Sequence, residues 1–331
     1  MSNHSYDLLA LGNAIVDVIA RAEEDFLARE EIHKGAMILI DEPRALHLNA
    51  AMGEGVVQSG GSAANTVAGA ASLGIKTAYI GKVKADEMGA AFRRDIEALG
   101  AVFPTAAAQD GPATARCFII VTPDGERTMN TYLGACQNLT VADVDKATVE
   151  ASSIVYLEGY LWDPPAAKEA FVKASGIAHA AGRRVALTLS DSFCVDRYRD
   201  EFLGLMRNGT VDIVFANQHE LKSLYQTADF DTAVTELRKE GVLGAVTLSE
   251  RGSMIVTRDT VTTVPAYPIK ELVDTTGAGD LYAAGFLAGL AQGRSHVDCA
   301  RLGAIAAAEV IQHIGARPQT SLAKLANFYG L

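Results

Sequence analysis

The sequence predicts an α/β protein in which a doubly wound parallel sheet carries helices on both faces. Two observations support this fold class: short apolar strands alternate with helical stretches from residue 150 onward, and two long helices close the chain. Such alternation places successive strands side by side in one parallel sheet. The strands are predicted at 154–157, 184–189, 213–216 and 245–248, the helices between them at 164–181, 197–207, 218–225 and 230–240, and the closing helices at about 279–292 and 296–313.

The first half of the chain adds strands and a helix of the same kind. Residues 6–11 form a short apolar run that ends at Gly12-Asn13, a pattern typical of a buried strand leading into a turn. A further strand is predicted at 78–83 and an amphipathic helix at 86–99.

Two early segments, about 13–41 and 102–136, are rich in strand-forming residues. The second contains Pro-Asp-Gly-Glu at 123–126, which is typical of a hairpin turn. We expect both segments to form a small sheet that covers the ligand end of the large sheet as a lid. The lid and the large sheet together are predicted to make one domain spanning 1–331.

Composition excludes several classes of function. The chain has 40 acidic and 29 basic residues and a net charge of -11, which disfavours nucleic acid and anionic membrane as partners. No apolar run is long enough to span a membrane, and the N-terminus lacks the basic region of a signal peptide. The four cysteines are widely spaced and form no C-x-x-C pair, so we expect a reducing, cytoplasmic setting.

The most specific segment is Asp274-Thr275-Thr276-Gly277-Ala278-Gly279-Asp280, which opens the first closing helix. Its two glycines let the backbone approach a ligand closely. The helix N-terminus directs free N–H groups and a partial positive charge to the same point. The segment therefore predicts an anion hole suited to a phosphoryl group in transfer.

Asp280 lies inside this positive field and is the predicted catalytic base. The field should keep its carboxylate ionised, which makes it a weak base. A weak base suffices when the transition state is loose and the attacking hydroxyl loses its proton late. The alternative is a structural acid in the first turn of a helix.

A second glycine-rich stretch, 60–74, begins with Gly60-Gly61-Ser62. It could cradle sugar hydroxyls, or it could allow a helix to pack closely on the sheet. It is not a P-loop, because Ile75 stands where the lysine must follow. The turn after the first strand also lacks the G-x-G-x-x-G of dinucleotide-binding proteins.

The chain resembles the ribokinase-like, PfkB-type family of carbohydrate and nucleoside kinases. Residues 274–280 match the C-terminal signature of the family, and 60–74 resemble the N-terminal one. Asn217-Gln218-His219-Glu220 matches the N-x-x-E element, and residues 247–252 resemble the nucleotide-side loop. The resemblance covers nearly the whole chain and implies a ribokinase-like fold.

The resemblance also implies ATP and Mg²⁺ as cofactors and assigns roles by position. Asp280 is the base, with an anion hole made by the amides of Gly277, Ala278 and Gly279. The residues implied for the substrate are Asn13, Asp17, Gly61, Ser62 and Asn65, and those implied for ATP are Asn217, Thr247, Ser249, Gly252, Gly277 and Gly279. Glu220 would act on Mg²⁺ through water, and Asp274 would hold a monovalent cation such as K⁺.

Several of these positions have ordinary structural alternatives. Asn217 and Glu220 also fit a polar helix start, and Asp17 also fits a solvated loop acid. Ser249 departs from the family pattern, which often has glycine there.

Tyr160 and Phe193 each follow a predicted strand, at the ligand end of the sheet. Their rings could stack on a purine, or they could pack in the core. Within the family the chain resembles the adenosine kinases, so we expect phosphorylation of adenosine at its 5′-hydroxyl. The alternatives are a sugar kinase acting on ribose, fructose or a keto-deoxy sugar, and a non-catalytic nucleoside or sugar sensor. Both a monomer and a homodimer are compatible with the sequence.

Overall fold

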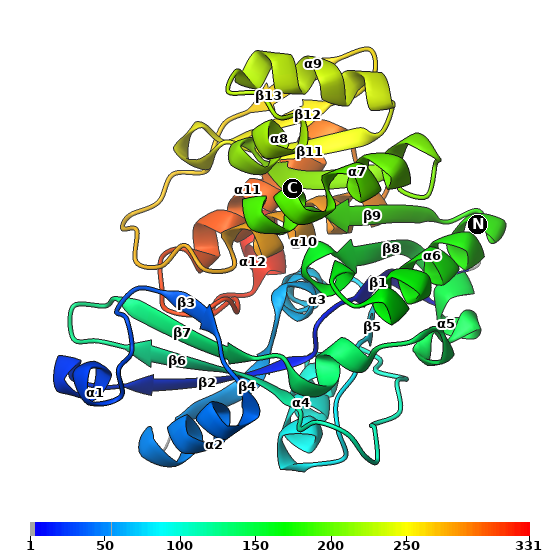
Figure 1. Ribbon diagram of the computed structural model, residues 1–331. Coiled ribbons are helices and arrows are strands. Elements are labelled where there is room, and N and C mark those ends of the chain that lie inside the picture. Colours follow the sequence, from blue (N-terminus) through cyan, green and yellow to red (C-terminus); the bar gives the residue numbers. More distant parts are fainter. Residues whose placement is uncertain (1–3, 54) are drawn as a thin grey trace.

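The computed structural model describes residues 4–53 and 55–331 and contains one large and one small sheet (Figure 1). The large sheet has eight strands in the order β13-β12-β11-β10-β9-β8-β1-β5. Their bounds are β1 Tyr6–Leu11, β5 Thr77–Ile80, β8 Ser152–Glu158, β9 Arg184–Thr188, β10 Ile213–Asn217, β11 Leu243–Thr247, β12 Ser253–Val256 and β13 Val261–Val264. The strands from β5 to β11 pair in parallel, which confirms the predicted fold class.

Helices cover both faces of this sheet because its strands are apolar on both sides. In β1, Leu8 and Ala10 belong to the core beneath α3, α10 and α11, whereas Leu9 and Leu11 belong to the core beneath α6 to α9. Parallel strands buried on two faces show this continuous apolar pattern. The helices are α3 Ser62–Ser72, α4 Glu87–Ala98, α5 Lys146–Glu150, α6 Pro165–Ala180, α7 Ser192–Arg207, α8 Gln218–Leu224, α9 Phe230–Glu240, α10 Ala278–Ala291, α11 His296–Val310 and α12 Leu322–Phe328.

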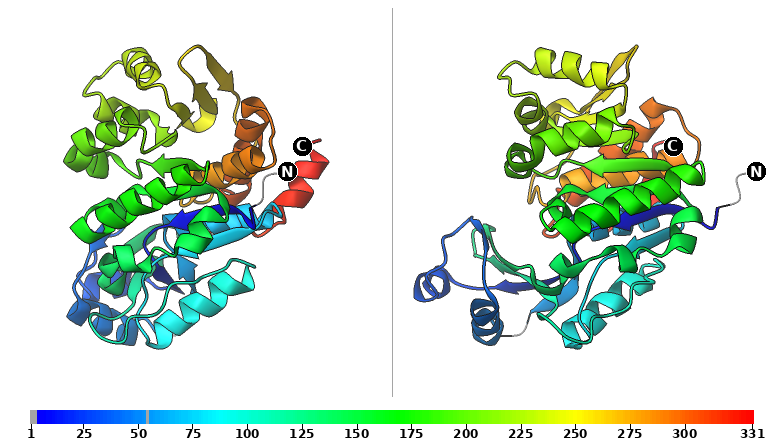
Figure 2. Two further views of the ribbon diagram at one scale, coloured as in Figure 1. Left: turned by 90° about the vertical axis from the view of Figure 1, so that its right-hand side faces the viewer. Right: turned by 45° about the vertical axis from the view of Figure 1, so that its right-hand side comes forward.

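The small sheet has five strands in the order β3-β7-β6-β2-β4 and projects from one side of the large sheet (Figure 2). Its strands are β2 Ile15–Arg21, β3 Met37–Leu39, β4 Val56–Gly60, β6 Ala115–Val121 and β7 Arg127–Tyr132, and the helices α1 Glu24–Arg29 and α2 Glu42–Ala51 accompany it. The small sheet confirms the expected second sheet, which we call the lid.

The lid differs from the expectation in two places. Strand β4, which pairs antiparallel with β2, lies outside the expected segments 13–41 and 102–136. Residues 102–114, expected in the lid, form no strand there. Instead, Val102 bridges to Ala78 beside the large sheet.

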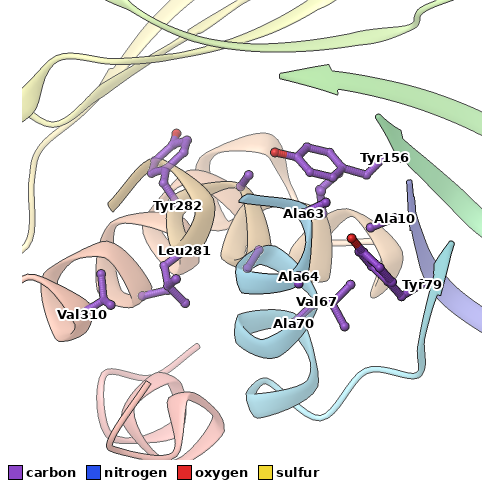
Figure 3. Packing of buried hydrophobic residues seen from close by; sticks show 14 of the residues in the cluster. Ala10, Ala63, Ala64, Val67, Ala70, Tyr79, Tyr156, Leu281, Tyr282 and Val310 are labelled. Carbon is purple, nitrogen blue, oxygen red and sulfur yellow. The ribbon is translucent and has the colours of Figure 1, made fainter. Parts of the chain in front are cut away.

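Helices α3 and α10 lie against each other beside the first strand (Figure 3). Ala63, Ala64 and Val67 of α3 are fully buried in this contact region. A Cβ at Gly69 would lie 2.5 Å from Leu281 Cδ1 and 2.7 Å from Ala284 Cβ, both on α10. Small residues of 60–74 therefore permit close packing, but of α3 on the helix α10, whereas the sequence alternative was packing of a helix on the sheet.

No helix within the described ranges combines the length and the apolar character that a membrane crossing requires.

The contact at Gly69 leads to a stability prediction. Gly69→Ala should lower the free energy of unfolding by about 1–3 kcal/mol, because the added methyl overpacks the contact with α10. The matched control is Gly176→Ala in α6, where nothing lies within 4 Å of the new Cβ. That variant should gain about 0.5–1 kcal/mol from helix propensity. Urea unfolding of both variants checks the prediction, and equal stabilities would contradict the packing argument.

Candidate active site

A cavity of about 600 Å³ lies at the carboxyl ends of the parallel strands, between the large sheet and the lid. This is the edge at which ligands bind in open α/β sheets. The structure brings most of the predicted site residues together in its lining: Asn13, Asp17, Gly61, Ser62, Asn65, Tyr160, Phe193, Asn217, Glu220, Thr247, Gly277, Ala278, Gly279 and Asp280. Ser249, Gly252 and Asp274 do not line it.

The N-terminus of α10 faces this cavity. Gly277 is its N-cap with φ 80°, and a Cβ there would lie 2.6 Å from Ala316 Cβ, so glycine is required twice over. Among the described residues, none accepts a hydrogen bond from the amides of Gly277 and Gly279. The amide of Ala278 instead donates to the Thr275 carbonyl at 3.2 Å. Two of the three expected amides are therefore free to bind an anion.

Asp280 is held by two side chains of α3. Ser62 Oγ donates to one carboxylate oxygen at 2.6 Å, and Asn65 Nδ2 donates to the other at 3.0 Å. Burial raises the pKa of Asp280 above its ordinary value, while these hydrogen bonds and the charge of Arg317 lower it. The expectation of a weak base is corrected by this burial, because a raised pKa makes the carboxylate a better proton acceptor.

Ser62 and Asn65 thus orient the predicted base as well as lining the cavity. Thr66 Oγ1 adds a hydrogen bond to the Asp280 carbonyl at 3.2 Å. A carboxylate fixed through both oxygens keeps one orientation, which is what a general base needs.

Asp17 lies on β2 of the lid and points into the cavity. No described residue donates a hydrogen bond to its carboxylate, and burial raises its pKa to about 6 against the opposing charges of Arg317 and Arg127. A Cβ at Gly60 would lie 2.3 Å from this carboxylate, so the glycine leaves room for it. Asp17 is therefore a cavity acid and not a solvated loop acid.

Glu158, at the end of β8, is a site residue for which sequence reasoning proposed no role. Its two oxygens accept hydrogen bonds from Asn13 Nδ2 at 2.7 Å and from the Ala63 amide at 2.8 Å. Burial raises its pKa to about 7 against these hydrogen bonds. Glu158 thereby joins the turn after β1 to the start of α3. Its position directly after a strand was the signal that could have identified it.

Asn217 and Glu220 form a capping box at the start of α8. The Asn217 side chain accepts from the Glu220 amide at 2.9 Å, and Glu220 accepts from the Asn217 amide at 2.9 Å. This is the structural alternative raised for these residues. Both also line the cavity, and burial raises the pKa of Glu220 to about 7.

The nucleotide-side loop lies only partly at the cavity. Thr247 lines it, but the turn that follows serves the packing of the β11–β12 connection. A Cβ at Gly252 would lie 2.1 Å from the Val264 carbonyl, and Ser249 has φ 54°. A left-handed residue at position 249 explains why glycine suits this place.

Asp274 lies behind the anion hole and pairs with Arg127 of lid strand β7. Both side chains are almost completely buried, with 8% exposure for Arg127 and 7% for Asp274. Asp274 also accepts from the amides of Thr276 at 2.9 Å and Gly315 at 3.0 Å. Arg127 lines the cavity and carries no sequence motif, so sequence reasoning missed it. The ion pair ties the lid to the loop before α10.

Tyr160 and Phe193 lie at the cavity as expected. Phe193 is 77% exposed at the second position of α7, which excludes the core-packing alternative for its ring. Tyr160 is half-buried, and its hydroxyl donates to the Ser190 carbonyl at 3.4 Å.

The two glycines of the anion hole should respond differently to an added methyl. Gly277→Ala should cost about 1–2 kcal/mol of stability, because its φ is left-handed and Ala316 occupies the space. Gly279→Ala should fold normally, since nothing lies within 4 Å of the new Cβ, yet lose about 10²-fold in kcat, because the methyl would crowd the phosphoryl group that this segment is predicted to bind. Thermal melting and steady-state kinetics of both variants test this. A Gly279→Ala enzyme with unchanged kcat would contradict the assignment.

Comparison with known proteins places this geometry in a family. The family model for pfkB family carbohydrate kinases matches residues 8–322. The crystal structure of adenosine kinase from Sinorhizobium meliloti is 55% identical, with a TM-score of 0.90 over 98% of this chain and 99% of that chain. A "probable sugar kinase protein" from Rhizobium etli CFN 42 is 53% identical, with a TM-score of 0.91 over 99% of both chains.

A curated relative gives the same result at lower identity. Adenosine kinase of Saccharomyces cerevisiae is 28% identical over 330 residues, which cover 93% of this chain and 95% of the yeast protein. The matches extend over nearly the whole chain. The chain belongs to the pfkB family of carbohydrate kinases.

Proposed function

We propose that the protein is an adenosine kinase, which transfers the γ-phosphoryl group of ATP to the 5′-hydroxyl of adenosine and releases AMP and ADP. The observation that carries the proposal is Asp280, oriented by Ser62 and Asn65 next to the free amides of Gly277 and Gly279. This arrangement offers a proton acceptor and an anion hole at one point. The similarity to the Sinorhizobium meliloti adenosine kinase supports adenosine as the acceptor.

Asp17 and the aromatic rim orient the nucleoside. The Asp17 carboxylate can accept both vicinal hydroxyls of a ribose, and it has no competing donor within the described part of the chain. Tyr160 and the exposed ring of Phe193 offer flat surfaces for the base at the cavity rim. The 5′-hydroxyl is then directed toward α10.

Asp280 accepts the proton of the 5′-hydroxyl as its oxygen bonds to the γ-phosphorus. The bond between that phosphorus and the bridging oxygen of ADP breaks in the same step. Negative charge on the transferred group is stabilised by the free amides and the dipole of α10. Closure of the lid over the cavity excludes water and limits hydrolysis of ATP.

The cavity residues fit Mg²⁺ as a partner of the nucleotide and not as a protein-bound ion. Within residues 4–53 and 55–331 no group of three or more His, Cys, Asp or Glu side chains could hold a metal. Mg²⁺ usually keeps several waters and binds through phosphates with one or two carboxylates. When bound, it would neutralise phosphate charge, with Glu220 holding one of its waters.

The residues around Asp274 fit a monovalent cation poorly. Its carboxylate already pairs with the Arg127 guanidinium, and both its oxygens accept hydrogen bonds. A potassium ion would lie beside this fixed positive charge and be repelled by it.

A sugar kinase is the second candidate, and the Rhizobium etli protein supports it. Ribose, fructose and 2-keto-3-deoxygluconate are its candidate acceptors. A non-catalytic sensor is the third, although it has no use for the oriented Asp280.

The four buried free cysteines agree with the proposed cytoplasmic setting. The monomer and the homodimer both remain predictions for the oligomeric state.

Turnover of a substrate panel with Mg-ATP separates these candidates. We expect kcat/KM for adenosine to exceed that for ribose, fructose and 2-keto-3-deoxygluconate by about 10²-fold or more, because a free sugar leaves the aromatic rim without a partner. A higher kcat/KM for any free sugar would replace adenosine by that sugar. ATP binding without turnover of any acceptor would favour the sensor.

Replacing Asp280 tests the proposed base. Asp280→Asn should lower kcat by about 10²–10⁴-fold with little change in KM for ATP, because the amide cannot accept the proton. Asp298→Asn is the matched control, since Asp298 is the third residue of α11 as Asp280 is of α10, but lies outside the cavity. Wild-type turnover in Asp280→Asn would rule Asp280 out as the base.

A further inference from the structure

Arg317 lies in the segment between α11 and α12, outside every motif that sequence reasoning identified. Its Nη1 donates to the Ala64 carbonyl in the first turn of α3 at 3.1 Å. Its Nη2 donates to Ser59 of lid strand β4, to Oγ at 2.7 Å and also to the carbonyl oxygen. One guanidinium therefore joins the segment after α11 to two neighbouring elements, β4 and α3, that lie more than 250 positions away in sequence.

The two contacts lie on either side of Gly60-Gly61, where the lid strand β4 turns into α3. Gly61 is the N-cap of α3 with φ 89°, and a Cβ there would lie 2.4 Å from the Asn13 carbonyl. Ser62, the next residue, is one of the two donors that orient Asp280. Fixing Ser59 and Ala64 thus fixes the turn from which Ser62 reaches the predicted base.

Arg317 also places a positive charge behind the acids of the cavity. The charged and titratable groups that act on it come from four elements: Asp95 of α4, Asp17 of β2, Tyr79 of β5 and Asp280 of α10. The Asp95 carboxylate has hydrogen-bond partners of its own, because it accepts from the Ser59 amide at 2.8 Å and from Ser59 Oγ. The remaining acids, Asp17 and Asp280, are the two that the proposed mechanism uses.

These two acids would otherwise resist ionisation. Asp17 faces the charges of Arg317, Arg127 and Asp280, and its pKa is raised by burial and by Asp280 but lowered by both arginines. Asp280 faces Ser62, Asn65 and Arg317, and Glu158 is a third acid close enough to interact with it. Burial and mutual repulsion both favour the neutral carboxyl, and Arg317 opposes them.

We infer that Arg317 is a positioning residue of the phosphoryl transfer: it clamps the junction of β4 and α3, from which Ser62 reaches Asp280, and its positive charge acts on Asp17 and Asp280. The effect on catalysis rests on the proposed function. Holding the junction by hydrogen bonds alone would be a structural role. An effect of the positive charge on the two acids would in addition change the pH at which the enzyme loses activity.

The test compares Arg317→Gln with Arg317→Lys in the full chain. Loss of the charge in Arg317→Gln should move the acidic limb of the pH profile of kcat/KM upward by about one pH unit or more, since an opposite charge nearby lowers a carboxyl pKa by about 1–3 units. Arg317→Lys keeps the charge but not the two-armed contact, so its acidic limb should stay within about 0.5 pH unit of wild type even if kcat falls. If the acidic limb of Arg317→Gln lies at the same pH as in wild type, the charge has no role and Arg317 acts only by holding the junction of β4 and α3.

A control on the far side of the guanidinium keeps the test decisive if Arg317→Gln fails to fold. Asp95→Asn removes the competing acid and retains Arg317, so the acidic limb should stay in place or move to lower pH. A move to higher pH would overturn the inference. Carboxyl-carbon NMR titration of Asp17 and Asp280 in wild type, Arg317→Lys and Arg317→Gln needs no substrate, so it separates failure of the charge effect from failure of the proposed function. The same titration of both acids in wild type and Arg317→Gln would also overturn the inference.

Discussion

The close contact between α3 and α10 is the constraint on which the site depends. Each helix begins at a glycine N-cap with positive φ, Gly61 and Gly277, and both starts face the same cavity. Ser62 and Asn65 of α3 donate hydrogen bonds to the carboxylate of Asp280 on α10. The base, its supporting donors and the anion hole therefore keep their relative positions only while the two helices stay in close contact. Small residues along 62–72 are what permit it.

Electrostatic balance is the second constraint. The cavity contains the carboxylates of Asp17, Glu158 and Asp280, all with pKa values raised by burial. Two guanidiniums oppose this: Arg127 of the lid and Arg317 both act on Asp17, and Arg317 also acts on Asp280. Because an enzyme of this kind must receive the anionic phosphates of its cosubstrate, positive charge supplied by side chains and amides offsets an otherwise acidic surface. The net charge of -11 alone would not suggest such a site.

The sequence predicted those parts that depend on local patterns. The parallel strands, most of the helices and the turn at 274–280 follow from short-range periodicity and from glycine positions, and the structure confirms the fold class. The parts that sequence-based prediction missed depend on long-range contacts. Glu158 acts on a residue 145 positions away and Arg127 on one 147 positions away, while the partner of Arg317 in β4 is 258 positions away. No window of sequence contains both members of such a pair.

The edges of the sheets were missed for a related reason. Strand β4 is short and its first two residues are exposed, and the antiparallel pair β12–β13 interrupts the strand–helix alternation on which the prediction relied. In the loop at 247–252, Ser249 and Gly252 serve a turn and its packing and do not line the cavity, so their role on the nucleotide side stays a prediction.

The place of β1 in the large sheet has a consequence for how the chain acquires its structure. β1 is made first but lies between β5 and β8, and its register partner in β8 is Ile154 for Leu8. During synthesis the first strand must wait for about 140 further residues before its second neighbour exists, at ~5–20 residues per second. Contacts of this sequence separation slow folding. The nascent N-terminal half therefore exposes one apolar strand edge for several seconds.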